Sequence, residues 1–168
     1  METKKILRLI LFALIASYSM NAFSKFQVKF SGGLETLGNK RGIAASETPF
    51  LIKVGLQNGN VFRWSSTFAF ILGANYKQGD FGLGTSVYPL ANITKSIVQP
   101  FLYVEGFLGL GRFSSDGTNF ETRMDPGYNL GVGVDLEIFK KYGIHLMVEN
   151  HGGKESSQRL LFGIYSKN

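Results

Sequence analysis

The sequence predicts an all-β protein, an eight-stranded antiparallel up-and-down β-barrel that spans a membrane. Apolar and polar residues alternate with a period of two, which is the period of a β-strand. The chain holds 21 Gly and only 4 Pro, and glycine weakens a helix by about 1 kcal/mol per residue. One alternating set is bulky and apolar, whereas the other combines glycine and small polar residues with charges of both signs. We therefore expect hydrocarbon outside the barrel and a narrow lumen inside it.

Eight alternating runs define the expected strands. They cover residues 26–31, 50–57, 62–73, 81–88, 102–111, 128–138, 144–149 and 159–165. Between the second and third runs, Asn58-Gly59-Asn60 tolerates positive φ and predicts a hairpin. With the first strand starting at the periplasmic end, periplasmic turns fall near residues 58–60, 91–97 and 140–142. The external loops then fall near residues 38–49, 76–79, 114–126 and 152–156, and most are longer, as in bacterial outer-membrane barrels.

Residues 1–24 have the layout of a secretory signal peptide. A positive segment with Lys4, Lys5 and Arg8 overlaps an apolar stretch that ends at Ile15. Ala22-Phe23-Ser24 then offers a cleavage site with small residues. A retained anchor helix is the alternative, but an apolar run of about a dozen residues is shorter than the ~20 that span a bilayer. Removal of the segment leaves residues 25–168 as one barrel domain.

Composition limits the other classes of function. The chain has no Cys, although small secreted domains with thin cores usually depend on disulfides, so embedding in lipid is another way to stabilise it. Loss of Lys4, Lys5, Arg8 and Glu2 lowers the net charge from +6 to +4. Because the remaining Lys and Arg form no stripe on a periodic face, no nucleic-acid partner is expected. With two His and no Cys, neither a transition-metal site nor a cofactor is expected.

Charged residues occur in the set of positions that faces the expected lumen. They are Lys29, Glu35, Lys53, Arg63, Glu105, Asp135, Glu137, Glu149 and Arg159. An acidic pair such as Asp135 and Glu137 is costly on a buried face unless cations from other strands match it. Eight strands also leave little lumen. The sequence therefore predicts a plugged, ion-paired interior rather than an open pore.

Aromatic residues fall near both ends of the expected strands, where rings form girdles at the membrane surfaces. Those near the periplasmic ends are Phe26, Phe62, Trp64, Tyr88, Phe101, Tyr103, Phe139, Tyr142 and Tyr165. Those near the outer ends are Phe50, Tyr76, Phe81, Phe113 and Tyr128. The alternative explanation is that aromatic residues simply favour strands.

Two glycine-rich stretches carry a resemblance to a known family. They are residues 100–111 (PFLYVEGFLGLG) and residues 131–137 (GVGVDLE). On this pattern of glycine and alternation, most of the mature chain resembles the outer-membrane protein A-like family of eight-stranded barrels. The resemblance implies an outer-membrane protein that the barrel-assembly machinery folds. Many such barrels end in Phe or Trp, whereas this chain ends Tyr165-Ser166-Lys167-Asn168.

A lipid A 3-O-deacylase is the main alternative function. Such barrels carry a His-x-Ser-Asn motif and a Glu near the last hairpin, but here Gly153 stands where the nucleophilic Ser follows His151. Ser156 or Ser157 comes within reach of the imidazole only if the loop folds back. By alternation His151 also points into the lumen, away from a membrane lipid. Ser114-Ser115-Asp116 is a weaker indication of a palmitoyltransferase-type barrel, since such residues also suit a solvated loop. No catalytic residue is assigned.

We expect a monomeric, non-enzymatic protein of the cell outer membrane, with a structural, adhesive or surface-interaction role. A narrow channel is the third interpretation. Five cations are expected near the outer surface: Lys40, Arg41, Arg112, Arg123 and Lys154. Because Lys and Arg pair with phosphates, outer-membrane lipids, including lipopolysaccharide, are the expected partners. The alternative is a rim of charges that only keeps the loops solvated.

Overall fold

The structure is a computed structural model that describes residues 26–37, 48–91, 97–114, 118–153 and 156–167. The expected signal peptide, residues 1–24, lies outside the described residues. The strands are β1 (Phe26–Leu37), β2 (Phe50–Gly59), β3 (Phe62–Leu72), β4 (Tyr76–Val87), β5 (Val98–Phe113), β6 (Glu121–Phe139), β7 (Tyr142–Gly152) and β8 (Ser156–Lys167). The described part of the chain holds no helix long and apolar enough to cross a membrane.

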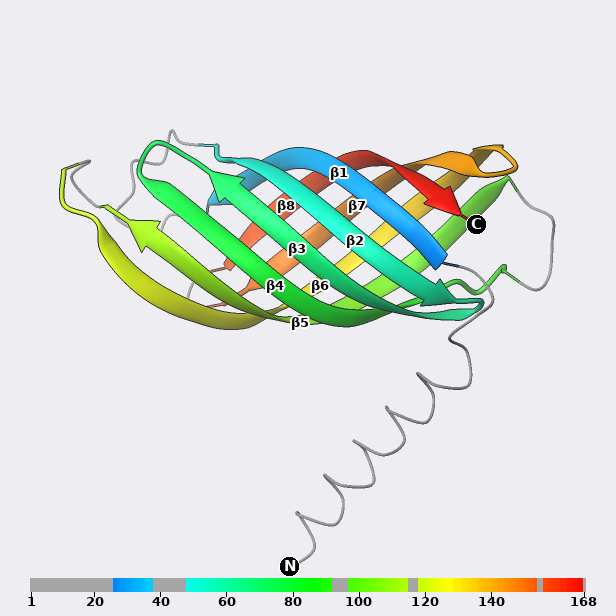
Figure 1. Ribbon diagram of the computed structural model, residues 1–168, viewed down its shortest axis with the longest axis horizontal. Coiled ribbons are helices and arrows are strands. Elements are labelled where there is room, and N and C mark those ends of the chain that lie inside the picture. The colour runs from blue at the N-terminus through cyan, green and yellow to red at the C-terminus, as the bar shows by residue number, and fades with distance from the viewer. Residues whose placement is uncertain (1–25, 38–47, 92–96, 115–117, 154–155, 168) are drawn as a thin grey trace, which may run out of the picture.

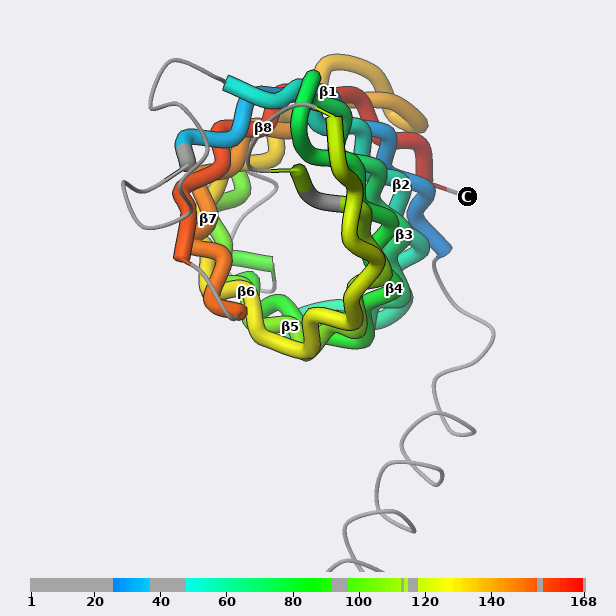
Figure 2. The backbone as a smooth tube through the Cα atoms, turned by 90° about the vertical axis from the view of Figure 1, so that its left-hand side faces the viewer, coloured from blue at the N-terminus to red at the C-terminus, as the bar shows by residue number. Residues whose placement is uncertain are grey.

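The eight strands form one closed barrel in chain order (Figure 1). Each strand is antiparallel to its neighbours, and β1 pairs with β8 from Gln27↔Lys167 to Leu37↔Ser157, which closes the ring (Figure 2). This pairing satisfies the backbone hydrogen-bonding groups of β1 and β8, which would otherwise be the two free edges of an open sheet. The predicted all-β, eight-stranded, antiparallel up-and-down barrel is confirmed.

The start of β1 and the finish of β8 lie at the same end of the barrel (Figure 1). We call this the terminal end; it carries Phe26, Lys167 and the β2–β3, β4–β5 and β6–β7 connections. The opposite end, which we call the loop end, carries the β1–β2, β3–β4, β5–β6 and β7–β8 connections. The predicted hairpin at Asn58-Gly59-Asn60 is present, and Gly59 has a φ of 130°, a conformation that favours glycine.

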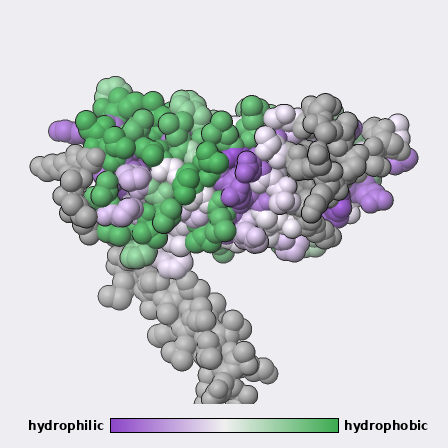
Figure 3. Space-filling view, turned by 180° about the vertical axis from the view of Figure 1, so that it is seen from behind, coloured by the Kyte–Doolittle hydropathy of each residue, from purple (hydrophilic) through white to green (hydrophobic). Residues whose placement is uncertain are grey.

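Side chains alternate between the outer face and the interior along the strands. On β2, Phe50, Val54 and Leu56 are 38–47% exposed, whereas Leu51 and Lys53 are at most 6% exposed. Figure 3 shows apolar side chains gathered into a band on the outer face. A soluble barrel would direct its apolar set inward. This chain does the reverse, as the alternation of its sequence predicted.

Five strands begin earlier than predicted, and the difference is largest for β4 and β6. β4 begins at Tyr76, so the external loop expected at 76–79 is wrong. Lys77 and Gly79 occupy outward positions there, which removes the apolar half of the alternating pattern. β6 begins at Glu121, because residues 121–127 continue the pairing with β5 beyond the predicted strand. These changes shorten the β3–β4 and β5–β6 connections to residues 73–75 and 114–120.

Five aromatic residues expected at the membrane surfaces lie in the interior instead. Tyr76, Tyr88, Phe101, Tyr103 and Tyr165 are at most 6% exposed, because four of them occupy inward positions of their strands and Tyr88, directly after β4, also turns inward. The girdle prediction is wrong for these five. Outward rings remain at both ends, with Phe26, Phe62, Phe139 and Tyr142 near the terminal end and Phe50, Phe81 and Tyr128 nearer the loop end.

Inward rings and inward glycines fit together inside the barrel. The Phe101 ring stacks between Tyr88 and His145, with ring centroids 5.1 and 5.3 Å away. A Cβ atom on Gly133 would collide with the Phe101 ring, and one on Gly143 would collide with the Tyr165 ring. Glycine at these two positions therefore makes room for aromatic side chains that fill the lumen.

Candidate functional site

Charged side chains from all eight strands meet inside the barrel. The inward cations are Lys29, Lys53, Arg63 and Arg159, and they pair with the inward carboxylates of Glu35, Asp80, Glu105, Asp135 and Glu149. A buried charge is costly unless it is paired and hydrogen-bonded. These residues form three clusters along the barrel axis, which we name after the cation at the centre of each.

In the Lys53 cluster, residues from five strands meet across the lumen. Lys53 Nζ on β2 lies 3.1 Å from Glu105 Oε1 on β5 and 3.0 Å from Glu149 Oε2 on β7. Thr67 and Tyr103 donate their hydroxyls to Glu105 Oε2, and Asn129 Nδ2 donates to Oε1 at 2.6 Å. Both oxygens of the Glu105 carboxylate are therefore satisfied by groups from four other positions.

The Lys29 cluster lies toward the terminal end. Lys29 Nζ donates to Asp135 Oδ2 at 2.8 Å and to the Tyr88 hydroxyl at 2.7 Å. His145 Nδ1 lies 2.6 Å from Asp135 Oδ1 and 3.2 Å from Lys29 Nζ. The Arg63 guanidinium lies over the Tyr88 ring, 3.6 Å from its centroid, and 4.0 Å from Asp135. One carboxylate thus faces two cations and two hydrogen-bonding rings.

The Arg159 cluster lies toward the loop end. The guanidinium of Arg159 is 1% exposed and lies 3.3 Å from Glu35, 3.3 Å from Asp80 and 3.5 Å from Glu149. Ser157 donates its hydroxyl to Glu35. Because Glu149 contacts both Arg159 and Lys53, the Arg159 and Lys53 clusters form one continuous network.

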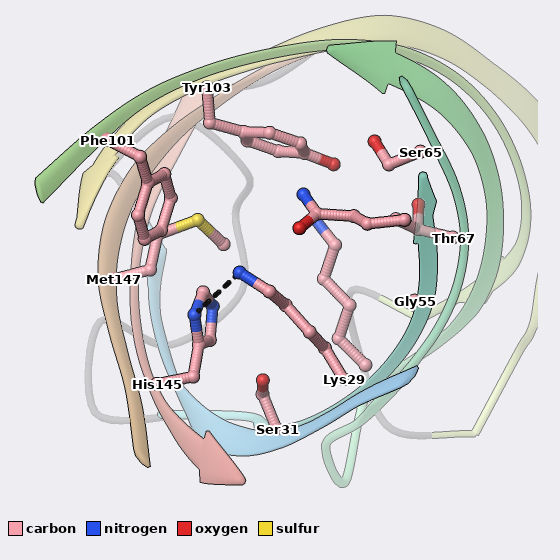
Figure 4. Close-up of a pocket in the computed structure, with 11 residues that line it drawn as sticks. Lys29, Ser31, Gly55, Ser65, Thr67, Phe101, Tyr103, His145 and Met147 are labelled. Atoms are coloured by element: carbon pink, nitrogen blue, oxygen red, sulfur yellow. Dashed lines mark hydrogen bonds between the residues drawn. The ribbon is translucent and has the colours of Figure 1, made fainter. Parts of the chain in front are cut away.

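A small cavity lies between the Lys29 and Lys53 clusters (Figure 4). Its volume is about 30 Å³, which is room for about two water molecules. Lys29 extends across it toward His145, and Ser65 and Thr67 line the opposite side (Figure 4). The Ser65 hydroxyl is buried without a protein partner among the described residues, so a water molecule in the cavity would satisfy it.

The structure brings together most of the residues that the sequence placed in the lumen. Glu137 is the exception. It lies near the terminal end of β6, where the pairing with β7 shifts register between Glu137 and Phe139. Its side chain is 35% exposed and pairs with Lys167 instead of joining the interior network. The prediction of Glu137 in the lumen network is wrong. The period-two pattern indicates which face of the strand a residue occupies, but not its position along the barrel axis.

Sequence reasoning left Asp80 and His145 out of the network. The inward position of His145 follows the alternation of β7, which was a usable signal. Asp80 was missed because the predicted fourth strand began one residue after it.

The residues considered for a hydrolase lie inside the barrel. His151 is fully buried, with Nδ1 2.8 Å from Asn129 Oδ1 and its ring stacked on Phe107 at 4.3 Å. Ser157 lies directly opposite His151 on β8, so no loop has to fold back to bring these strand positions together. Both side chains are buried on the inward side of their strands. Among the described residues, no three His, Cys, Asp or Glu side chains are grouped to hold a metal ion.

Comparison with known proteins identifies the fold. No protein-family profile and no curated protein sequence matches the chain. Neisserial surface protein A superposes with a TM-score of 0.69 at 13% identity, covering 85% of this chain and 98% of that one. The N-terminal β-barrel domain of Pseudomonas aeruginosa OprF gives 0.63 at 8% identity, covering 86% and 97%. The fold is that of the small outer-membrane β-barrels.

A third similar structure is Ail, the attachment invasion locus protein of Yersinia pestis, in complex with the heparin analogue sucrose octasulfate. It gives a TM-score of 0.55 at 14% identity and covers 86% of this chain and 97% of its own. These neighbours agree with the resemblance to outer-membrane protein A-like barrels that the sequence carries. At such identities the likeness concerns the fold alone.

Two of the five cations expected to contact lipopolysaccharide are described. Arg112 is exposed on the outer face near the loop end of β5, with its guanidinium 5.3 Å from the Phe120 ring. Arg123 is half-buried and lies opposite Gly111, on the inward side of β6. Lys40, Arg41 and Lys154 lie outside the described residues. Arg112 therefore has an outward position that suits a lipid contact, and Arg123 does not.

Proposed function

We propose that this chain is a non-enzymatic outer-membrane protein that works as a sealed barrel and presents its loop end at the cell surface. In this proposal residues 1–24 direct export and are removed, and the barrel-assembly machinery inserts the monomeric remainder. The terminal end faces the periplasm, because it carries the two shortest connections, residues 60–61 and 140–141, and short turns face that side in bacterial outer-membrane barrels. The role is structural or one of surface interaction, with lipopolysaccharide among the partners.

The observation that carries the proposal is the filled middle of the lumen; the wider hollow, of about 540 Å³, lies at the terminal end beside Arg63 and Asp135. Lys53 and Arg159 reach partners on strands across the lumen, and the Arg63 guanidinium covers the Tyr88 ring. The cavity left between the Lys29 and Lys53 clusters has a volume of about 30 Å³. A continuous path for hydrated ions would require several of these charge pairs to separate, which is costly in a buried site. These features support a plugged lumen rather than a channel.

Planar-bilayer recording of the full protein tests this proposal. The unaltered barrel is expected to give no stable open current. A Lys53→Ser/Glu105→Ser variant removes two long side chains of opposite charge from the lumen and is expected to open intermittently. A Lys77→Ser/Arg112→Ser variant, which alters two outward cations, serves as the matched control and is expected to stay closed. A stable single-channel current from the unaltered protein would refute the sealed barrel and favour the narrow channel.

A further inference from the structure

Two cations lie side by side on the outer face near the loop end. Lys77 on β4 is directly opposite Arg112 on β5 in the antiparallel register. Both residues are exposed and both occupy outward positions, since Tyr76, Gln78 and Gly111 beside them are buried. The next outward residue of β5 toward the terminal end is Leu110, which is 60% exposed and belongs to the apolar band. The pair therefore lies at the border of this band.

This arrangement is unfavourable without a counter-charge. Like charges directly opposite on neighbouring strands destabilise a sheet. The other cross-strand neighbours are Leu72 for Lys77 and Thr122 for Arg112, neither of which is acidic. Within the described part of the chain, neither cation forms an ion pair with a carboxylate. An anion placed between them would offset the repulsion.

A gap in the apolar face lies next to the cation pair. Gly79 is the outward residue of β4 that follows Lys77, and a Cβ built on it would meet no atom within 4 Å. Its cross-strand neighbours are Phe70 on β3 and Leu110 on β5, which are 48% and 60% exposed. The missing side chain leaves a notch between two bulky apolar residues, on the side of the cations that faces the centre of the apolar band.

We propose that Lys77 and Arg112 bind a phosphate group of an acylated, phosphorylated glycolipid of the outer leaflet, and that one of its hydrocarbon chains lies over Gly79. This assignment rests on the proposed function, because it places the loop end at the outer leaflet. Arginine binds phosphate with two parallel hydrogen bonds, and lysine adds a compact point charge. A ligand with a phosphate beside a hydrocarbon chain matches a cation pair beside an apolar notch. A free phosphate ion has no hydrocarbon chain to place in the notch. Lipid A, the membrane part of lipopolysaccharide, has both groups.

Binding of lipid A to the full protein in phosphatidylcholine nanodiscs tests the assignment. The unaltered protein is expected to bind bisphosphorylated lipid A more tightly than dephosphorylated lipid A, by roughly tenfold or more. Lys77→Gln/Arg112→Gln is expected to abolish this preference. Lys140→Gln/Lys141→Gln, which alters two exposed cations at the terminal end, is the matched control and is expected to retain it. Gly79→Leu fills the notch and is expected to weaken binding of both forms of lipid A.

Several results would overturn the assignment. One is that Lys77→Gln/Arg112→Gln still prefers bisphosphorylated over dephosphorylated lipid A. Another is that Gly79→Leu binds lipid A as tightly as the unaltered protein. A third is that inorganic phosphate displaces lipid A. Equal binding of phosphatidylglycerol in place of lipid A would also overturn it, because the site would then accept any anionic lipid. Conductance measured on the same preparations separates this assignment from the proposed function. A barrel that does not conduct and binds both forms of lipid A equally refutes only the lipid site. A barrel that conducts but prefers bisphosphorylated lipid A refutes only the sealed lumen.

Discussion

Replacement of Lys53 by Met is expected to destabilise the folded barrel by about 3–5 kcal/mol. Lys53 is the cation that lies 3.1 Å from Glu105 and 3.0 Å from Glu149, and its side chain is 7% exposed. Met fills a similar volume but leaves Glu105 buried with no cation within ion-pair distance. Urea unfolding of the protein in phosphatidylcholine vesicles, followed by the shift of the folded band in detergent gels, measures the effect.

Lys140→Met is the matched control for this experiment. Lys140 has the same side chain but is exposed in the β6–β7 turn, so the change in unfolding free energy is expected to stay within about 0.5 kcal/mol. A double variant, Lys53→Met/Glu105→Gln, removes both charges and is expected to recover part of the lost stability. Equal stability of Lys53→Met and Lys140→Met would contradict the description of the interior network.

An arginine introduced on the outer face is expected to lower the free energy of unfolding by an amount that depends on its depth in the bilayer. Val104 lies midway along the outward row of β5 between Val98 and Leu110. Val104→Arg places a charge near the middle of the hydrocarbon and is expected to cost about 2–4 kcal/mol, whereas Val98→Arg near the terminal end is expected to cost about 0–1 kcal/mol. Fluorescence of the single tryptophan, Trp64, during urea unfolding in vesicles reports both values.

The two variants control for each other, since the same substitution is made on the same face of the same strand. Val98 and Val104 are 46% and 44% exposed, so burial by the protein does not explain a difference between them. Equal costs, or a larger cost at Val98, would show that the outer face of β5 does not lie in a bilayer with Val104 near its centre.

The alternation of the sequence was enough to predict the barrel, and it failed where outward residues are not apolar. At the start of β4, Lys77 and Gly79 take the outward positions, so the strand is hidden until Phe81. At the start of β6, residues 121–127 extend the hairpin with β5 and lack the apolar alternation of the rest of the strand. Both failures have one physical cause, because only strand segments that face hydrocarbon need an apolar outer face.

The sequence was enough to predict most of the residues that belong to the interior network, but not which of them form ion pairs with each other. A period of two places Lys53 and Glu149 on the inward face of their strands. These residues are 96 positions apart, and only the stagger of the strands around the ring brings them to the same height. Glu137 shows the same limit, since it keeps the inward alternation of β6 but lies at the terminal end, where it pairs with Lys167. The pairing depends on the register of all eight strands, which local patterns do not specify.

The orientation of the two faces is tested most directly by tryptophan fluorescence in vesicles made with brominated acyl chains, which quench rings that touch lipid. Single-tryptophan variants are made in a Trp64→Phe background at two pairs of adjacent positions on β5. Leu102→Trp and Leu108→Trp replace side chains that are 59% and 48% exposed, and Tyr103→Trp and Phe107→Trp replace side chains that are 6% exposed. Strong quenching at 102 and 108 with weak quenching at 103 and 107 is the expected result. Stronger quenching at 103 and 107 would place the glycines and charges against lipid and contradict the structure described above.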